Sequence, residues 1–277
     1  MTTATALPSR HWSQLTSAQL GALDCARLIA VLPLGACEQH GPHLPLGTDA
    51  DMAAAMVRAA IPHLAPDVPA VFLPVQRIGY SVEHLGFPGT LSLSATTVLA
   101  LWGDIAESLS ASGIKKLLLF NTHGGHEGLM DTAARAWRQR LGMLVYSTSW
   151  YKLPLVDENG TDLMARMSAE ERRFGVHAGQ SETSMMLALD ALHVDMLRAQ
   201  HFASTSRQRA AAFPILGNGA SAKLAWMARD LNPAGAAGNA AAATADYGHA
   251  LIDATGRALA ALLAEIHRLP PDTVRPL

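Results

Sequence analysis

The sequence has few cysteines, little net charge and no long apolar run, and each of these absences bears on where the protein works and what it binds. Its two cysteines, Cys25 and Cys37, are too few for a disulfide framework, which favours a reducing compartment. The formal net charge of −2 gives no basic footprint for nucleic acid or an anionic membrane. No uncharged apolar run is long enough to span a membrane, and the first residues lack the pattern of a signal peptide. We therefore expect a cytoplasmic protein with no nucleic-acid or membrane partner.

The composition is that of a folded, globular chain. Apolar residues make up 49% of the 277 positions and charged residues 16%, which excludes intrinsic disorder. Twelve histidines stand against four tyrosines, so the histidine positions are of interest. The Ala- and Gly-rich stretch 233–245 could pass for a linker, but a helical pattern over 244–269 follows it. We therefore predict a single domain, 1–277.

Apolar runs of strand length alternate with segments of helical periodicity. The predicted strands are 28–34, 70–75, 116–121 and 144–149. The predicted helices between and after them are 52–64, 95–112 and 127–141, the first capped by Thr48 or Asp49. Residues 204–220 are predicted as loop. This alternation predicts an α/β fold, with a mostly parallel sheet covered by helices on both faces.

Two polar clusters follow predicted strands. Residues 33–51 read PLGACEQHGPHLPLGTDAD, a Pro- and Gly-rich loop that can hold polar side chains in fixed places. Its chemistry-bearing side chains are Glu38, His40, His43, Asp49 and Asp51. A second cluster, NTHGGHE, occupies residues 121–127. Functional loops lie beyond the carboxyl ends of parallel strands, so we expect the two clusters to meet, as carboxylates and imidazoles that suit a divalent cation.

Simpler roles exist for single residues. Asp49 alone could be only a helix cap. His43 is expected to be a structural hydrogen-bond donor in its turn. The segment 123–126 could form a nest for phosphate, although no lysine or second glycine motif accompanies it. Cys37 beside Glu38 could be imagined as a nucleophile, but it lacks an activating basic neighbour, so a small buried thiol is expected.

Four segments, in this order and spacing, resemble the creatininase (creatinine amidohydrolase) family. They are LPLGACEQHGPHLPLGTD, EHLGFPGTLSL, NTHGGH and HAGQSETS, and the similarity runs from the first strand to the terminal helix. The resemblance implies an α/β domain with a binuclear metal centre that hydrolyses amide, often cyclic amide, bonds. It also implies a homo-oligomer, with hexamers among the family members.

The resemblance assigns the metal ligands residue by residue. Glu38 and His123 would bind one metal ion, His40 would bind the other, and Asp49 would bridge the two. Such a pair of cations could hold a water molecule and lower its pKa, and the resulting hydroxide would attack an amide carbonyl. Zinc is the expected metal, with manganese or iron as alternatives. His177, which matches a family histidine and stands beside the carboxylate of Glu182, would shuttle the proton to the leaving nitrogen, and these two are the expected catalytic residues.

The sequence departs from creatininase itself at two positions. Creatininase has a further metal-binding glutamate where this chain has Gly125. The second metal would then take water, Glu182, or, as a further candidate, Glu127. The residue after His-Gly-Gly is usually Asn and is here His126, which could alter substrate contacts. Other residues expected to shape the substrate pocket are Glu83, His84, Gly124 and Gly125.

We therefore expect a metal-dependent hydrolase of a carbon–nitrogen bond in a small molecule, most simply a cyclic amide or lactam. Within the family, the alternatives are a short-peptide hydrolase that matures a peptide-derived cofactor and a deformylase of pyrimidine intermediates. The alternative outside enzymes is a metal-binding scaffold without catalysis. The sequence favours an enzyme, because a scaffold would not need His177 beside an open metal site.

Overall fold

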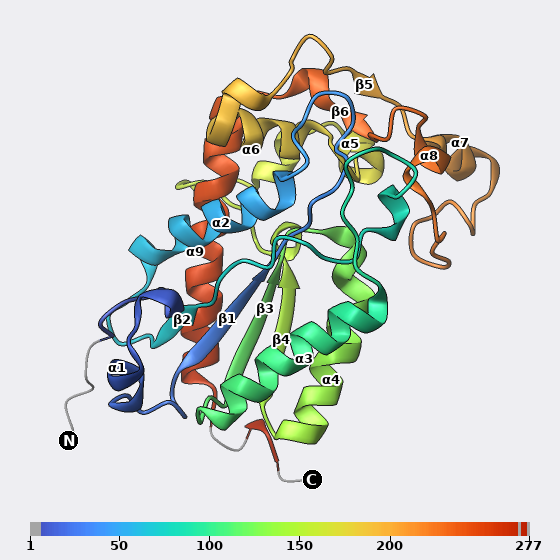
Figure 1. Cartoon of the computed structure of the whole chain (residues 1–277). Coiled ribbons are helices and arrows are strands. Elements are labelled where there is room, and N and C mark those ends of the chain that lie inside the picture. The colour runs from blue at the N-terminus through green and yellow to red at the C-terminus, as the bar shows by residue number, and fades with distance from the viewer. Residues whose placement is uncertain (1–6, 271–272, 276–277) are drawn as a thin grey trace.

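A four-stranded parallel sheet forms the centre of the molecule (Figure 1). The computed structural model describes residues 7–270 and 273–275. The strand order is β2–β1–β3–β4, and every neighbouring pair is parallel. The strands are β1 (Ile29–Leu34), β2 (Ala70–Phe72), β3 (Lys116–Asn121) and β4 (Leu144–Ser149). They fall within the predicted runs and confirm a parallel sheet.

The two inner strands are apolar on both faces because helices cover both faces of the sheet. Ile29 and Val31 of β1 pack into one hydrophobic core, whereas Ala30 and Leu32 pack into the other. Such continuous apolar runs are typical of a parallel strand that is buried on both sides. The first core is closed by α2 (Thr48–Ala60), α6 (Gln180–Asp190) and α9 (Ala245–Arg268), and the second by α3 (Ala95–Ala111) and α4 (Glu127–Leu141).

The second half of the chain adds shorter elements above the carboxyl end of the sheet. They are α5 (Ala169–Phe174), the antiparallel pair β5 (His201–Phe202) and β6 (Gly238–Asn239), α7 (Thr205–Ala212) and α8 (Ala228–Leu231). The short α-helix α1 (Ser17–Gly21) lies near the amino terminus. The prediction of a loop over 204–220 was wrong for α7. None of its residues is buried, so no apolar periodicity marks it, and Ser204 caps it by accepting a hydrogen bond from the amide of Ser206.

The predicted side-chain cap of α2 was also wrong. Gly47 occupies the cap position, and no side chain there accepts a helix amide. Thr48 Oγ1 instead donates to the carbonyl of Pro45 at 2.7 Å. The Asp49 carboxylate is therefore not used as a cap, and it points away from its own helix toward two histidines, as described below.

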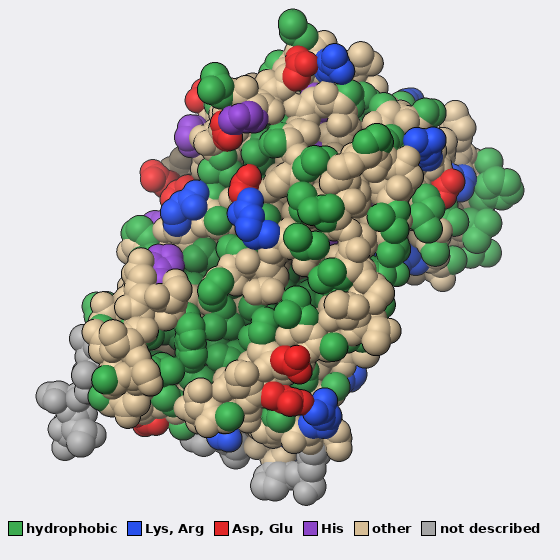
Figure 2. All heavy atoms as spheres, viewed as in Figure 1, with side chains coloured by type: hydrophobic (Ala, Val, Ile, Leu, Met, Phe, Trp, Pro, Cys, Tyr) green, Lys and Arg blue, Asp and Glu red, His purple; other side chains and the backbone are tan. Residues whose placement is uncertain are grey.

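Helix hydropathy and the charges on one face of the molecule bear on the expected partners. Among the described residues, no helix combines the length and hydropathy needed to cross a bilayer. On the face shown in Figure 2, acidic and basic side chains are interspersed. This distribution agrees with the low net charge of the sequence.

Candidate active site

A cavity of about 380 Å³ opens where the sheet strands end. Its walls include Glu38 from the loop after β1, His123 from the turn after β3, and Trp150 and Tyr151 directly after β4. The two polar clusters of the sequence therefore meet, as predicted from the shared direction of parallel strands.

Asp49 lies at the centre of a group of buried polar side chains and contacts two histidines. Its Oδ1 lies 3.3 Å from Nε2 of His40, and its Oδ2 lies 3.3 Å from Nδ1 of His123. The same nitrogen of His123 lies 3.2 Å from Oε1 of Glu38. All four side chains are buried. Asp49 thus faces both histidines, the position that a bridging carboxylate needs.

Backbone carbonyls orient both imidazoles. Nδ1 of His40 donates to the carbonyl of Glu38 at 3.0 Å, and Nε2 of His123 donates to the carbonyl of Tyr80 at 2.8 Å. In each ring the other nitrogen therefore carries a lone pair and faces Asp49. Asn121, at the end of β3, holds the turn by bonding both the amide and the carbonyl of His123. Such outer contacts fix ring tautomers at metal sites.

The residues present fit a pair of divalent cations. Four atoms of the cluster are buried without a hydrogen-bond partner among the described residues: Glu38 Oε1 and Oε2, His40 Nε2 and Asp49 Oδ2. Leaving such groups unpaired is costly, and a cation would satisfy them together. Two sets of potential ligand atoms, each within 4.8 Å of one another, share Asp49: Glu38–Asp49–His123 and His40–Asp49–Glu182.

Glu182 reaches this centre from the first turn of α6. Its Oε2 accepts a hydrogen bond from the amide of Ala178 at 2.5 Å, and Ala178 adopts a left-handed conformation with φ of 52°. Burial raises the pKa of Glu182 to about 7, against the opposing effect of nearby His40. In the same region His177 lies with Nδ1 3.8 Å from Glu38 Oε1, and a third ligand set, Glu38–His40–His177, includes it.

Comparison with known proteins identifies the family. The family model described as "Creatininase: Creatinine amidohydrolase" matches residues 13–263. The chain belongs to the creatininase family. Creatinine amidohydrolase from Pseudomonas putida is 30% identical over 203 residues, which are 65% of this chain and 70% of that protein.

Another relative has a different name. Mycofactocin precursor peptide peptidase from Mycolicibacterium smegmatis is 31% identical over 161 residues, which are 57% of each chain. The match therefore spans little more than half the length of that relative.

Two solved creatininase structures share the fold. The one named "Creatininase Mn" is 25% identical with a TM-score of 0.71, covering 94% of this chain and 100% of that one. A mutant creatininase named as a Zn-Zn type is 24% identical with a TM-score of 0.73, covering 94% and 99%. These likenesses confirm the predicted helix-covered parallel sheet.

The structure gives a physical reason for the departure of this family member at Gly125. A Cβ atom there would overlap Glu83 Oε1 and His123 Nε2, and it would lie 2.9 Å from the carbonyl oxygen of Tyr80. A glutamate side chain therefore has no room at this position. Glu83 fills the corner instead, with Oε1 3.6 Å from His123 Nε2, and burial raises the pKa of its carboxyl group.

Glu127, the further candidate for the second metal, belongs to another network. Its Oε1 accepts hydrogen bonds from Tyr151 Oη at 2.7 Å and from Lys152 Nζ at 2.8 Å. It is absent from the ligand sets found among the described residues. Glu182, not Glu127, is therefore the carboxylate that the fold brings to His40 and Asp49.

His126 lies behind the cavity wall. Its Nδ1 donates to Asn121 Oδ1 at 3.0 Å, and its Nε2 accepts from the amide of Tyr80 at 3.1 Å. The ring is fully buried and packs edge-on against Trp102. With both nitrogens occupied, His126 supports the turn that carries His123, and the expected direct substrate contact is not supported. Glu83, His84, Gly124 and Gly125 do line the cavity.

Structural roles were expected for His43 and Cys37. His43 Nε2 lies 2.9 Å from Thr183 Oγ1, its ring stacks on Phe202, and burial lowers its pKa to about 4. Cys37 is only half-buried, so the prediction of a buried thiol was wrong. Partial burial still raises the pKa of this thiol, which agrees with an unreactive cysteine.

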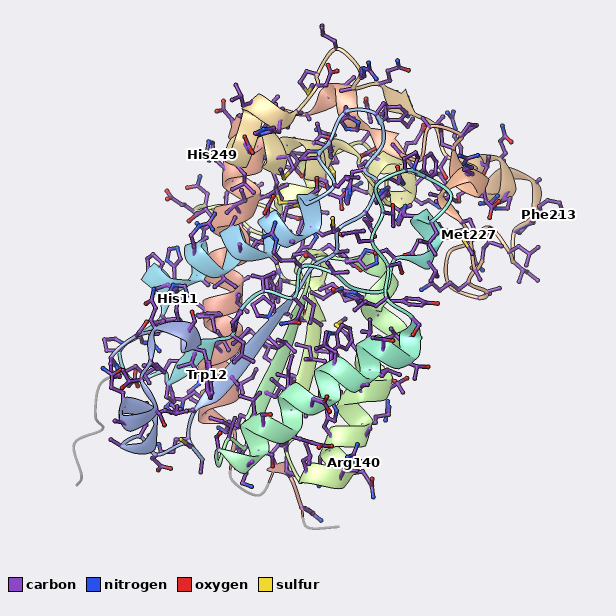
Figure 3. The ribbon with its side chains drawn as sticks, viewed as in Figure 1. His11, Trp12, Arg140, Phe213, Met227 and His249 are labelled. Atoms are coloured by element: carbon purple, nitrogen blue, oxygen red, sulfur yellow. The ribbon has the colours of Figure 1, made fainter. Side chains whose placement is uncertain are left out.

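Several cavity residues could not be found from the sequence. Tyr151, Arg172, Lys223 and Trp226 all line it, and none of them belongs to a recognisable sequence motif. Lys223 and Trp226 belong to the arm between α7 and α8, which carries the exposed Phe213 and Met227 labelled in Figure 3. Gln39 was also missed, although its place between Glu38 and His40 could have drawn attention to it.

Proposed function

We propose that this protein is a metal-dependent amidohydrolase with two divalent cations, which cleaves a carbon–nitrogen bond in a small molecule, most simply a cyclic amide. The observation that carries the proposal is the pair of ligand sets that share Asp49. One cation would be held by Glu38, Asp49 and His123, the other by His40, Asp49 and Glu182. Zinc is the first choice, with manganese or iron as alternatives, and the names of the solved relatives support zinc and manganese.

The bound cations would polarise the substrate carbonyl and activate water. The chain's own contribution to proton transfer is assigned to His177. Its Nε2 donates to the carbonyl of Gln39 at 2.8 Å, so Nδ1 is the basic nitrogen and faces the metal ligands. Nδ1 would take a proton from the attacking water and release it to the leaving nitrogen.

The cavity suits a small substrate. Its volume of about 380 Å³ lies toward the lower end of the range of about 300–1,000 Å³ for small-molecule sites. Thr122 lines the cavity: its hydroxyl donates to the carbonyl of Asp49 at 2.8 Å and its amide donates to the carbonyl of Leu34 at 2.9 Å, which ties the two ligand-bearing segments together. A rigid wall of this kind favours precise positioning of one amide group.

A short-peptide hydrolase is the second candidate, favoured by the name of the Mycolicibacterium relative and by the charge of the cavity. Two carboxylates of the cavity wall already have partners. Glu127 pairs with Lys152, and Glu171 accepts hydrogen bonds from the backbone amides of Gln180 and Asn239. Arg172 and Lys223 also line the cavity and have no ion pair among the described residues. Two free cations would suit the terminal carboxylate of a peptide.

Metal content and a substrate panel together test the proposal. The protein, purified without chelator, is subjected to elemental analysis and assayed on creatinine, other cyclic amides, N-formyl compounds and short peptides with free or amidated carboxyl ends. About two metals per chain with turnover of a ring amide supports the first candidate. Turnover only of peptides with a free carboxylate supports the second. Bound metal without turnover of any amide would favour a scaffold.

We also propose a cytoplasmic homo-oligomer. Both cysteines are free thiols, which suits a reducing compartment. The arm between α7 and α8 exposes Phe213, Ile215 and Leu216, which subunit contacts could cover. Light scattering coupled to gel filtration would give the number of subunits, and a monomer would contradict this part of the proposal.

A further inference from the structure

The side chain of Gln39 lies buried between the metal ligands and two histidines of the cavity. Its Oε1 accepts from the amide of Gly41 at 2.9 Å, and its Nε2 donates to the carbonyl of Gly235 at 2.8 Å. If the side-chain amide were reversed, its oxygen would face the carbonyl oxygen of Gly235 and its NH2 group would face the N–H of Gly41. These two contacts therefore settle its orientation. Gly235 has φ of 81°, and a Cβ atom there would overlap Gln39 Oε1. The backbone is thus shaped to receive this amide.

The second hydrogen of Gln39 Nε2 determines the tautomer of His84. Nδ1 of His84 lies 2.7 Å from that nitrogen. Because an amide nitrogen only donates, His84 Nδ1 must accept, and the ring proton is on Nε2. Nε2 of His84 is 3.3 Å from Glu38 Oε1, yet Glu38 Oε1 has no well-directed hydrogen bond. The Nε2–H group is therefore a donor at the cavity wall that has no well-aligned acceptor there.

The backbone of Gln39 sets the opposite tautomer on His177. The carbonyl of Gln39 accepts from His177 Nε2 at 2.8 Å, which leaves the lone pair on Nδ1. Gln39 Nε2 also lies 3.3 Å from this nitrogen, but its two hydrogens already serve Gly235 and His84. The rings of His84 and His177 stack with centroids 4.2 Å apart. One residue therefore places a donor and a base side by side.

We propose that Gln39 is a positioning residue that fixes His84 as an Nε2–H donor and His177 as an Nδ1 base, and that His84 hydrogen-bonds the substrate carbonyl oxygen. The catalytic half of this inference rests on the proposed amide hydrolysis. As the water attacks, its proton goes to His177 Nδ1 and then to the leaving nitrogen. His84 keeps its own proton throughout and only stabilises the negative charge on oxygen.

The tautomers can be observed without any substrate. In the zinc-loaded protein with isotope-labelled histidine, long-range proton–nitrogen NMR spectra distinguish the two neutral ring forms. We expect the Nε2–H form for both His84 and His177, with signals assigned from the His84→Asn and His177→Asn variants. An Nδ1–H form of His84 in the unaltered protein would overturn the assignment of Gln39, whatever the enzyme hydrolyses.

A near-isosteric variant then tests the positioning role. Gln39→Glu replaces the donor by an acceptor, so His84 is expected to carry a proton on Nδ1. We expect kcat to fall at least tenfold, with a smaller change in KM and unchanged zinc content. His84→Asn is expected to lower kcat similarly, whereas Gln208→Glu, an exposed change on α7, should alter neither the spectrum nor kcat.

Three results would contradict the inference. A Gln39→Glu protein with an unchanged His84 tautomer and native kcat would remove the positioning role. A His84→Asn protein with native kcat would remove the donor role. If the unaltered protein hydrolyses no amide, the proposed function is overturned, and with it the roles of His84 and His177 in catalysis. The NMR spectrum of the unaltered protein would still show whether Gln39 fixes the His84 tautomer. That measurement does not depend on whether Gln39→Glu folds.

Discussion

A side chain at position 125 and the carboxylate of Glu83 cannot both occupy one corner of the cavity, because a Cβ atom on Gly125 would overlap Glu83 Oε1. This relationship separates the chain from creatininase, in which the resemblance places a metal-binding glutamate at the equivalent position. The carboxylate that reaches the second ligand set comes from Glu182 on α6 instead. We propose that Glu182 supplies the ligand that the resemblance assigns to that glutamate in creatininase.

Gly125→Glu is therefore not expected to rebuild the missing ligand. The new side chain would displace Glu83 and His123, and overpacking of this kind costs about 1–3 kcal/mol of stability. Thermal unfolding and metal analysis would measure the effect. Gly128→Glu is the matched control, because a Cβ atom at Gly128 meets nothing within 4 Å. A Gly125→Glu protein with native stability and full metal content would contradict the steric account.

Asp49→Ala is expected to remove both metals and all activity, because Asp49 belongs to both ligand sets. Elemental analysis after gel filtration gives the readout. Asp51→Ala, two residues along the same helix, removes only a pair with Arg77 at the surface and should leave both metals in place. Retention of two metals by Asp49→Ala would exclude a bridging role.

Glu182→Gln and Glu127→Gln distinguish the two carboxylates proposed for the second metal. We expect Glu182→Gln to hold about one metal per chain, since only the His40 set loses a ligand. Glu127→Gln should keep two, because Glu127 is bonded to Tyr151 and Lys152. The opposite pattern of metal content would reassign the ligand.

His177→Ala is expected to keep both metals and to lower kcat by about 10²–10⁴-fold, the usual contribution of a general base. His249→Ala, at the surface of α9 in Figure 3, is the control and should leave kcat unchanged. A native rate for His177→Ala would exclude proton transfer. Loss of one metal would instead make His177 a ligand, in line with the set that contains Glu38 and His40.

Removal of metal should lower thermal stability, because it leaves Glu38 Oε1 and Oε2, His40 Nε2 and Asp49 Oδ2 buried and unpaired. A site at a free-ion concentration one hundred times its Kd contributes about 2.7 kcal/mol. For a domain of this size that is a fall in Tm of roughly 5–10 °C per site. Differential scanning calorimetry with and without chelator would measure it. An unchanged Tm would mean that the cluster holds no tightly bound cation.

The sequence by itself determined the sheet and the edge of the sheet at which the two polar clusters meet. Ile29 and Ala30 face opposite cores because side chains alternate along a strand, and an unbroken apolar run reports burial on both sides. Glu38 and His40 lie in the loop after β1, Asp49 follows in the first turn of α2, and the parallel direction of β1 and β3 brings His123 to the same edge. The alternation of side chains along a strand and the spacing of Glu38, His40 and Asp49 are local, and the place of His123 follows from strand direction. All of them can therefore be predicted from the order of residues in the sequence.

Only the tertiary structure decided the rest. Thr48 or Asp49 was predicted to cap α2, because residue type alone does not show which way a side chain turns, and neither does so. Glu182 comes from a segment more than one hundred residues away, and its place depends on how α6 packs on α2 and α9. The contacts of Gln39 with His84 and Gly235, and the exclusion of a side chain at Gly125 by Glu83, join distant loops. Such contacts are set by packing in three dimensions, which no local pattern encodes.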